Sequence, residues 1–394
     1  MIKKFTAIYI IFFTIQISLG QYKQLSSSAE VSIITAGPGN VLFESFGHST
    51  IRIQDKILGI DDAYNYGIFD FDTPNFYLNF VKGNLFYKLE KYPFRYFVRS
   101  YKRQRRWVKE QILNLNQAEK QQFFEYLENN VKPENAFYSY DPFFNNCATK
   151  LRDITELVLQ EKVTFSDAHL LTKISIRKLT NKEIPWNSWG SFGINLALGN
   201  RLDKIASAKE YMYLPDYILS GFKNATINNN QAKEKLILKE HYILNYKELK
   251  HEIADLNPLL VFSILMIIGV VITFFDYKKN KRSRWLDFIL FFTTGLIGSL
   301  IVFLWFFTNH STAPNNFNFL WAFAPNLVVA FYISKKISKK WIKKYVKFLL
   351  VLFAIIPFIW LGKIQELPTS VMPILILLVV RYLFLTKKLL PSKK

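Results

Sequence analysis

Five long apolar stretches fill the last third of this 394-residue chain, and they constrain its fold more than any other feature. Basic segments separate them, and they cover residues 259–275, 286–307, 317–334, 348–361 and 371–385. A helix of about 20 apolar residues crosses a bilayer. Buried helices of a water-soluble protein are the alternative, but five in succession with charged loops between them argue against it. We therefore expect an all-α membrane domain of five transmembrane helices over residues 259–385.

The position of the positive charge predicts how this domain lies in the membrane. Residues 256–394 hold 18 Lys and Arg but only 3 Asp and Glu, out of 51 and 30 in the whole chain. Five basic residues follow the first apolar stretch, seven follow the third and four follow the fifth. Because Lys and Arg are enriched on the cytoplasmic side, the first stretch should run inward and the basic tail, residues 386–394, should be cytoplasmic. Charge in such blocks indicates a membrane protein and no nucleic-acid partner.

The N-terminus predicts that the part of the chain before the membrane domain is exported. Two lysines precede an apolar run over residues 5–15, and small residues follow near position 20. This pattern is typical of a secretory signal peptide, to which we assign residues 1–20. An uncleaved anchor helix is the alternative. Either way, the segment that follows lies outside the cytoplasm, in agreement with the basic loops.

Residues 21–222 are long enough for one domain with its own core. Segments that alternate in polarity or are rich in aromatic residues predict strands, over residues 31–35, 49–54 and 63–69. Segments with apolar residues at helical spacing predict helices, over residues 116–130 and after Asn146. Strands and helices are mixed without strict alternation, which favours an α+β fold. Residues 223–258 are polar and rich in Asn and Lys, so we interpret them as a connector to the membrane domain.

Cys147 is the only cysteine of the chain, which excludes disulfides and Cys-rich metal clusters. It follows Asn145 and Asn146, either of which is a good N-cap, so it falls in the first turn of a helix. Unpaired N–H groups and the helix dipole lower the pKa of a thiol there, and the thiolate is the nucleophile of covalent catalysis. A small buried apolar side chain is the alternative role for a single cysteine.

His48 stands at the entrance to an expected strand and is a candidate general base. A structural histidine is the alternative role. The five histidines are scattered without the spacing of zinc ligands. The chain also contains no P-loop, no glycine-rich dinucleotide motif and no G-x-S-x-G motif. We therefore expect no metal and no cofactor.

Several sequence stretches of the exported segment carry a specific resemblance. They are GPGNVLFESFGHSTIRI (37–53), YNYGIFDFDTPNFYLNFVKGNLFYKL (64–89), PENAFYSYDPFFNNCATKLRD (133–153), WGSFGINLALGNRLD (189–203) and YMYLPDYIL (211–219). Over most of residues 30–220 the segment resembles the N-terminal periplasmic domain of the Lnb family, which are bacterial lipoprotein N-acyltransferases. The five-span tail is similar to the membrane domain of that family. The motifs FGHS and NNCAT at this separation are specific to the family when they occur together, whereas either motif alone would not be.

The resemblance implies a permuted papain-like (NlpC/P60-like) fold in which a histidine precedes a cysteine at a helix start. Carried over by motif, Cys147 would be the nucleophile and His48 the base. Related permuted enzymes move fatty acyl groups off phospholipids. The resemblance therefore implies a phospholipid acyl donor, a diacylated lipoprotein acceptor, and a multi-pass protein of the bacterial inner membrane with its catalytic domain in the periplasm.

Two further roles follow from the residues around this pair. A third group should orient His48, and Asn65 or Tyr66 on the following strand is the candidate, because strand register decides between them. The tetrahedral oxyanion needs hydrogen-bond donors, for which the N–H of Cys147, helped by Asn146, is the nearest candidate. A cysteine hydrolase of lipid esters or cell-wall peptides, and a non-catalytic membrane protein that binds lipid or peptide, are the alternative functions.

Overall fold

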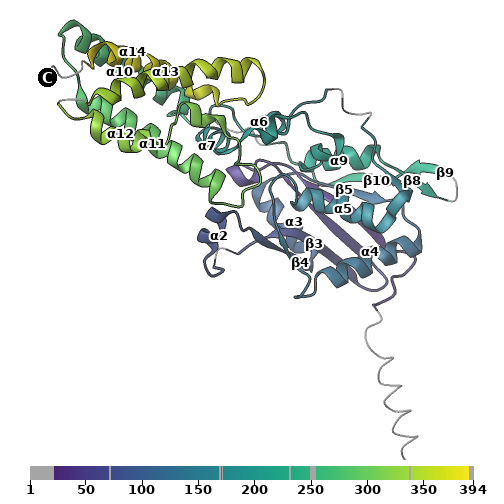
Figure 1. The fold of residues 1–394 in the computed structure, drawn as a ribbon. Coiled ribbons are helices and arrows are strands. Elements are labelled where there is room, and N and C mark those ends of the chain that lie inside the picture. Colours follow the sequence, from purple (N-terminus) through teal and green to yellow (C-terminus); the bar gives the residue numbers. More distant parts are fainter. Residues whose placement is uncertain are drawn as a thin grey trace, which may run out of the picture.

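The computed structural model describes residues 22–70, 72–167, 170, 172–229, 232–248, 254–336 and 339–389. The expected signal peptide, residues 1–20, and most of the expected basic tail lie outside the described residues. The described chain forms an α+β domain over residues 22–244 and a helical bundle over residues 258–388, joined end to end (Figure 1).

A seven-stranded antiparallel sheet forms the centre of the N-terminal domain, in the order β10-β5-β1-β2-β3-β4-β6. Its strands are β1 (Glu30–Ala36), β2 (His48–Asp55), β3 (Ile60–Ile68), β4 (Phe86–Pro93), β5 (Val108–Leu113), β6 (Phe137–Ser139) and β10 (Ile237–Leu244). Alternation fixes the register, because Ile51 and Ile53 of β2 are buried in the main core while Arg52 between them lies over the Phe94 ring on the opposite face.

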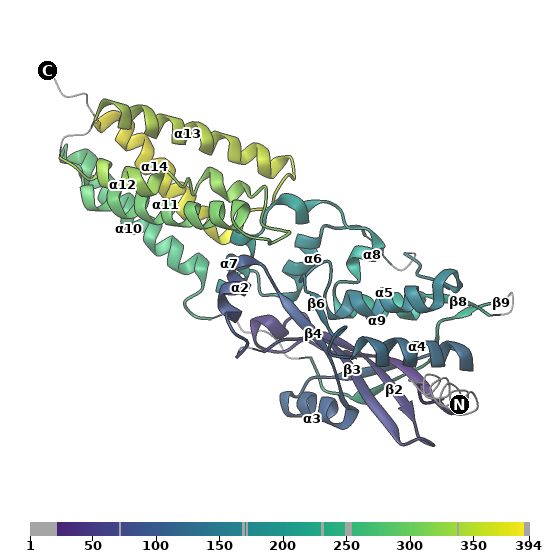
Figure 2. The same ribbon diagram turned by 60° about the horizontal axis from the view of Figure 1, so that its bottom comes forward.

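Helices cover both faces of this sheet (Figure 2). The helices α4 (Gln117–Asn130), α5 (Cys147–Leu159) and α9 (Pro215–Asn224) bury the main core with β1, β2 and β3. On the other face, α3 (Phe94–Gln104) packs Phe94 and Phe97 against Ile34 and Ala63. The α+β mixture, the three expected strands and the two expected helices are thus confirmed to within a few residues.

The interpretation of residues 223–258 as a polar connector is wrong. This segment contains β8 (Thr226–Asn229), β9 (Ala232–Lys235) and β10. β8 and β9 form a small sheet with β7 (Val163–Thr164), and β10 pairs with β5 at the edge of the large sheet. Edge strands commonly carry exposed charged side chains that prevent further pairing, which is why the composition of β10 resembles that of a linker.

Four helices of the described chain are long and apolar enough to cross a membrane, rather than the five expected. They are α10 (Pro258–Lys278), α11 (Arg284–Phe306), α13 (Lys340–Leu361) and α14 (Met372–Lys388), the last preceded by η5 (Thr369–Val371). The third apolar stretch, 317–334, is divided into η4 (Phe317–Leu320) and α12 (Asn326–Ile333). At about 1.5 Å per residue, the eight residues of α12 are too short to span a bilayer.

Close packing on α11 explains why the broken third stretch is tolerated in an apolar bundle. A Cβ on Gly295 would lie 2.0 Å from the Leu327 nitrogen, and a Cβ on Gly298 would lie 2.0 Å from the Ala322 oxygen. Asn326, which is fully buried, donates to Thr294 Oγ1 at 3.0 Å. Irregular backbone at membrane depth has to be buried within protein, and these glycines provide that burial.

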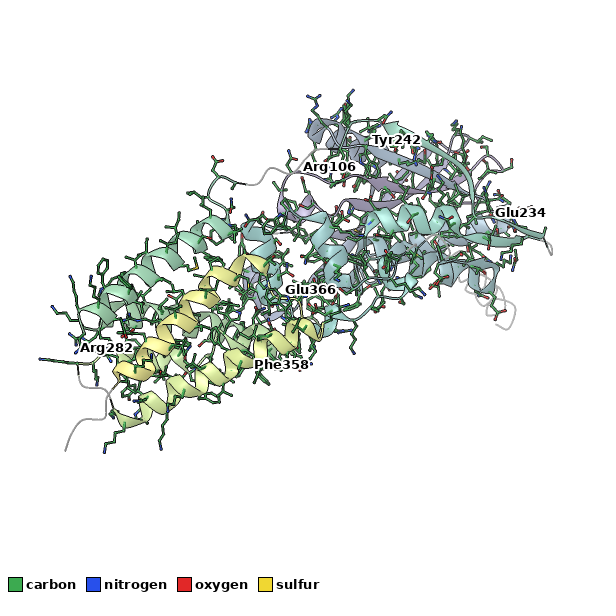
Figure 3. The ribbon with its side chains drawn as sticks, turned by 90° about the horizontal axis from the view of Figure 1, so that it is seen from above. Arg106, Glu234, Tyr242, Arg282, Phe358 and Glu366 are labelled. Atoms are coloured by element: carbon green, nitrogen blue, oxygen red, sulfur yellow. The ribbon has the colours of Figure 1, made fainter. Side chains whose placement is uncertain are left out.

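A buried polar seam joins the N-terminal domain to the bundle. Its helices are α6 (Ile176–Glu183), α7 (Trp189–Ala197) and η3 (Asn200–Asp203). Asn316 Nδ2 donates to the Leu196 carbonyl at 2.7 Å, and the Glu366 N–H donates to Asp203 Oδ1 at 2.9 Å. Figure 3 shows Glu366 at this junction and Arg282 at the opposite end of the bundle. Four short helices complete the fold: η1 (Leu42–Glu44), α2 (Phe76–Lys82), η2 (Gln160–Lys162) and α8 (Ala208–Tyr211).

Candidate active site

The start of α5 presents Cys147 at the first helical position, as the sequence predicts. Asn146 is the N-cap, and its Oδ1 accepts from the Thr149 N–H at 2.9 Å while Thr149 Oγ1 accepts from the Asn146 N–H at 2.8 Å. This capping box fixes the first turn. Cys147 is a free thiol, and the residue is partly exposed at the edge of the main core.

A bulge in β3 makes room for Cys147. The register between β3 and β4 shifts between Tyr66 and Ile68, and Gly67 at this shift has φ +89°. A Cβ on Gly67 would lie 3.7 Å from the Cys147 Cβ and 3.6 Å from the Tyr140 ring, in addition to its unfavourable backbone angle. Bulges are common beside active sites, and a glycine inside an aromatic strand is a sequence signal from which this bulge was predictable.

The His48 imidazole lies close enough to the Cys147 thiol for each group to shift the pKa of the other, and Asn65 holds the ring through a hydrogen bond. Asn65 Nδ2 donates to Tyr92 Oη at 2.8 Å, which directs its Oδ1 toward His48 Nε2 at 2.6 Å. Nε2 is therefore the protonated nitrogen of the neutral ring, and Nδ1 is left to accept the proton of the thiol. The three side chains thus lie in the order thiol, imidazole and amide.

Opposite pKa shifts couple the thiol and the imidazole. Burial raises the pKa of Cys147, but the His48 charge, the His48 hydrogen bond and the N–H groups of Ser49 and Ala148 together lower it below its ordinary value. Burial lowers the pKa of His48, but the Cys147 charge and the hydrogen bonds with Cys147 and Asn65 outweigh burial and the Arg106 charge, so that it is raised above 6.5. Both shifts act in the direction of thiolate and imidazolium.

Two of the other expected site residues have different positions. Tyr66 lies on the opposite face of β3 from Asn65, where its hydroxyl donates to Asn130 Oδ1 at 2.5 Å, so it does not contact His48. The Asn146 amide donates to the carbonyls of Pro142 and Tyr213, both at 2.8 Å. Its donors are thus used to hold the loop before α5, and they are not directed at a substrate oxygen. The backbone N–H of Cys147 lies at the helix start, where the sequence predicts it.

An open cavity of about 500 Å³ is bordered by Asn65, which holds the imidazole, on the face of the sheet that α3 covers. It is lined by Asn65, Ile68, Tyr92, Tyr96, Phe97, Ser100 and Tyr101. The Phe97 ring centroid is 6.3 Å from that of His48. A mostly apolar wall with a few polar groups is the common form of a ligand site.

The helical bundle contacts the loop that leads to Cys147. Ser311, which follows α11, donates from its hydroxyl to Asp141 Oδ2. The other carboxylate oxygen of Asp141 accepts from the N–H groups of Phe143 and Phe144, at 2.9 and 3.0 Å. The sequence held no signal for this contact, because 170 positions separate its two partners. Among the described residues, no group of three or more His, Cys, Asp or Glu is arranged to hold a metal ion.

Removing the Asn65 amide is expected to weaken the coupling between the Cys147 thiol and the His48 imidazole. In Asn65→Ala, the pKa of His48 falls because a hydrogen bond that raises it is lost. Less imidazolium then stabilises the thiolate, so the midpoint for alkylation of Cys147 by iodoacetamide moves to higher pH, by about one unit for one hydrogen bond. Mass spectrometry measures this directly because the chain has one cysteine. Tyr66→Phe, on the opposite face, is the control, and equal midpoints for both variants would contradict the role of Asn65.

Two family models match the chain. Residues 20–182 match the model of the Lnb N-terminal periplasmic domain, and residues 249–392 match that of the Lnb transmembrane domain. No curated protein and no solved structure shows a significant match to the chain. The two models together cover the candidate site and the bundle.

Proposed function

The chain belongs to the Lnb family, and we propose that it is a lipoprotein N-acyltransferase that carries a fatty acyl group on Cys147. In this reaction the group leaves a phospholipid and ends on the N-terminal amine of a lipid-modified lipoprotein cysteine. The observation that carries the proposal is that the Cys147 thiol and the Asn65-held His48 imidazole lie close enough to shift each other's pKa, in a domain fixed to a membrane bundle.

The domain pair makes this chain a multi-pass inner-membrane protein with a periplasmic domain. We further propose that the C-terminus is cytoplasmic. The basic block after α10 lies at the end of the bundle away from the periplasmic domain, and Lys388 near the end of α14 hydrogen-bonds with Asn280 in that block. The positive-inside rule supports a cytoplasmic location for this end.

The first half of the proposed reaction forms a thioester. His48 Nδ1 accepts the thiol proton, and the sulfur attacks the carbonyl carbon of a phospholipid ester. The backbone N–H of Cys147 is the nearest donor for the resulting oxyanion. When the tetrahedral intermediate collapses, the ester oxygen takes the proton from His48 and leaves as the hydroxyl of a lysophospholipid.

The second half transfers the acyl group to nitrogen. The α-amine of the lipoprotein, whose ordinary pKa is about 7.7–8.0, is partly unprotonated at neutral pH. It attacks the thioester carbon, His48 accepts one amine proton, and the Cys147 thiolate leaves. The product is an amide. Because the pKa of the Cys147 thiol is low, the thiolate is a better leaving group than the amine.

The fold supports this proposal in two respects. The histidine, on β2, precedes the cysteine, at the start of α5, in the chain. The strand belongs to an antiparallel sheet and the helix packs against that sheet, as a permuted papain-like fold requires. The cavity bordered by Asn65 is within the size range of sites for small ligands. We propose that an acyl chain occupies it while its carbonyl is at Cys147.

The test separates transfer from hydrolysis. The full chain in phospholipid vesicles is expected to gain the mass of one acyl group at Cys147, and hydroxylamine should remove that mass because it cleaves thioesters. A diacylated lipopeptide with a free N-terminal amine should then take up the acyl group. The same lipopeptide with an acetylated amine is the control substrate and should remain unchanged.

Two outcomes would contradict the transferase. Free fatty acid released at the same rate with either lipopeptide would indicate a cysteine hydrolase, since papain-like scaffolds support both reactions. An unmodified Cys147 together with unchanged lipids would instead favour a non-catalytic binding protein.

A further inference from the structure

The short helix α2 carries several apolar side chains that are about half exposed. None of its residues is buried, and Leu78, Phe80 and Val81 are 52, 49 and 46% exposed. A helix at the surface of a soluble domain buries one apolar face against the core. Neighbouring exposed apolar residues mark a site of contact with a partner or a membrane. The helix has no acidic residue and ends at Lys82.

Contacts with the bundle fix α2 at the level of the membrane surface. The Asn309 N–H donates to the Lys82 carbonyl at 2.7 Å, and Asn309 Nδ2 donates to Asn84 Oδ1 at 2.7 Å. Between these residues, Gly83 has φ +75°, and a Cβ there would lie 2.6 Å from the His310 nitrogen. Asn309 follows α11 by three residues, at the periplasmic end of a membrane-spanning helix. The end of α2 is therefore held where the bilayer meets the periplasm.

The exposed surface of α2 continues the lipid-facing surface of α11. Phe306 and Phe307 at the end of α11 are both highly exposed, as is typical of aromatic residues at a bilayer interface. Figure 1 shows α2 beside this end of α11. Continuity with a surface that must contact lipid identifies the outer leaflet, rather than a soluble protein, as the layer that covers α2.

A row of aromatic rings leads from α2 to the candidate nucleophile. Ring centroids lie 6.2 Å apart for Phe80 and Phe76, 5.8 Å for Phe76 and Phe69, and 4.9 Å for Phe69 and Tyr87. The Tyr87 ring stacks on Tyr140 at 4.3 Å, and Tyr140 lies beside the Gly67 bulge that faces Cys147. The stacked rings form a continuous row of apolar contacts between the helix and the residues around the sulfur.

We propose that α2 inserts Leu78, Phe80 and Val81 into the outer leaflet, and that the row of aromatic rings is the path by which a phospholipid acyl chain reaches Cys147. The insertion follows from the membrane position of the chain alone. The path rests on the proposed acyl transfer. Insertion beside the site supplies lipid directly from the leaflet and raises its effective concentration at the sulfur.

The insertion is tested without any use of catalysis. In a Cys147→Ala background the chain has no other cysteine, so Leu78→Cys carries a single environment-sensitive fluorophore. The full chain is placed in vesicles of brominated phospholipid, which quenches a probe within the acyl region. Ile57→Cys is the matched control. Ile57 is 70% exposed and lies in the turn after β2, and the carbonyl of the next residue, Leu58, accepts a hydrogen bond from Lys23.

We expect blue-shifted, bromine-quenched emission at position 78 and unquenched, water-like emission at position 57. Equal, water-like emission at both positions would overturn the insertion. A blue shift at position 78 without quenching would also overturn it, because a protein would then cover α2. Neither result depends on acyl transfer, so this test and that of the proposed function fail separately.

The path is tested with Leu78→Asp combined with Phe80→Asp. Each exposed side chain would lose its insertion into lipid, and transfer from vesicle phospholipid should fall about tenfold or more. Alkylation of Cys147 by iodoacetamide should be unchanged, because that reagent arrives through water, and Ile57→Asp should alter neither rate. Unchanged transfer in the double variant would overturn the path, as would a parallel loss of alkylation, which would indicate damage to the site.

Discussion

Replacement of Cys147 by Ala is expected to abolish acyl transfer and to leave cellular lipoproteins with two acyl chains and a free α-amine. The thioester cannot form without the sulfur, and removing the nucleophile of a covalent enzyme costs on the order of 10⁴-fold or more in rate. The measurement is the mass of N-terminal lipopeptides from cells in which this chain is the sole N-acyltransferase. Alanine is a good helix former, so α5 should still begin at position 147.

Two further variants separate a lost nucleophile from lost folding. Cys147→Ser keeps a small polar side chain at the helix start but should transfer almost nothing, because His48 is matched to a thiol rather than to a hydroxyl of far higher pKa. Tyr66→Phe changes a residue of β3 that faces away from the site and should retain transfer. Triacylated lipoproteins at normal abundance in the Cys147→Ala strain would refute the proposed function.

The local part of the candidate site was predictable from the sequence. Two Asn residues before Cys147 predict a helix start there, and the structure has α5 begin at Cys147 with Asn146 as its cap. Period-two alternation restricts the orienting group to Asn65 or Tyr66. The choice between them depends on which face of β3 packs on α4 and α5, and Tyr64 and Tyr66 occupy that face. Sequence alone gave no measure of this packing.

The misplaced elements share a physical cause, which is that composition does not report on tertiary partners. β10 carries charged residues because it is an edge strand, and its pairing with β5 involves residues more than a hundred positions away. The high mean hydropathy of residues 317–334 predicts a membrane-spanning helix there. Only the close approach to Gly295 and Gly298 allows its backbone to be irregular within the bundle. The same limit applies to the link between Ser311 and Asp141.

Replacement of Arg177 by Ala is expected to destabilise the junction between the two domains by about 3–5 kcal/mol. The guanidinium is fully buried, with Nε 2.8 Å from Asp203 Oδ1 and Nη1 2.9 Å from Asn195 Oδ1. Burial raises the pKa of Asp203 and the Arg177 charge opposes that rise. Without Arg177, a buried carboxyl group remains without its counter-ion, next to the Glu366 N–H that links it to the bundle.

The neighbouring residue of α6 provides the matched control. Lys178 pairs with the Glu366 carboxylate at 3.2 Å, but both side chains are substantially exposed, so Lys178→Ala should cost less than about 1 kcal/mol. The measurement is the thermal unfolding midpoint of the full chain in detergent, together with the rate of proteolysis between β10 and α10. Adding Asp203→Asn to Arg177→Ala should restore part of the loss, because it removes the unpaired charge.

Equal midpoints for Arg177→Ala and Lys178→Ala would show that the seam does not hold the domains together. A fall in midpoint confined to Arg177→Ala, accompanied by slower alkylation of Cys147, would show that the bundle helps to position the loop before the nucleophile.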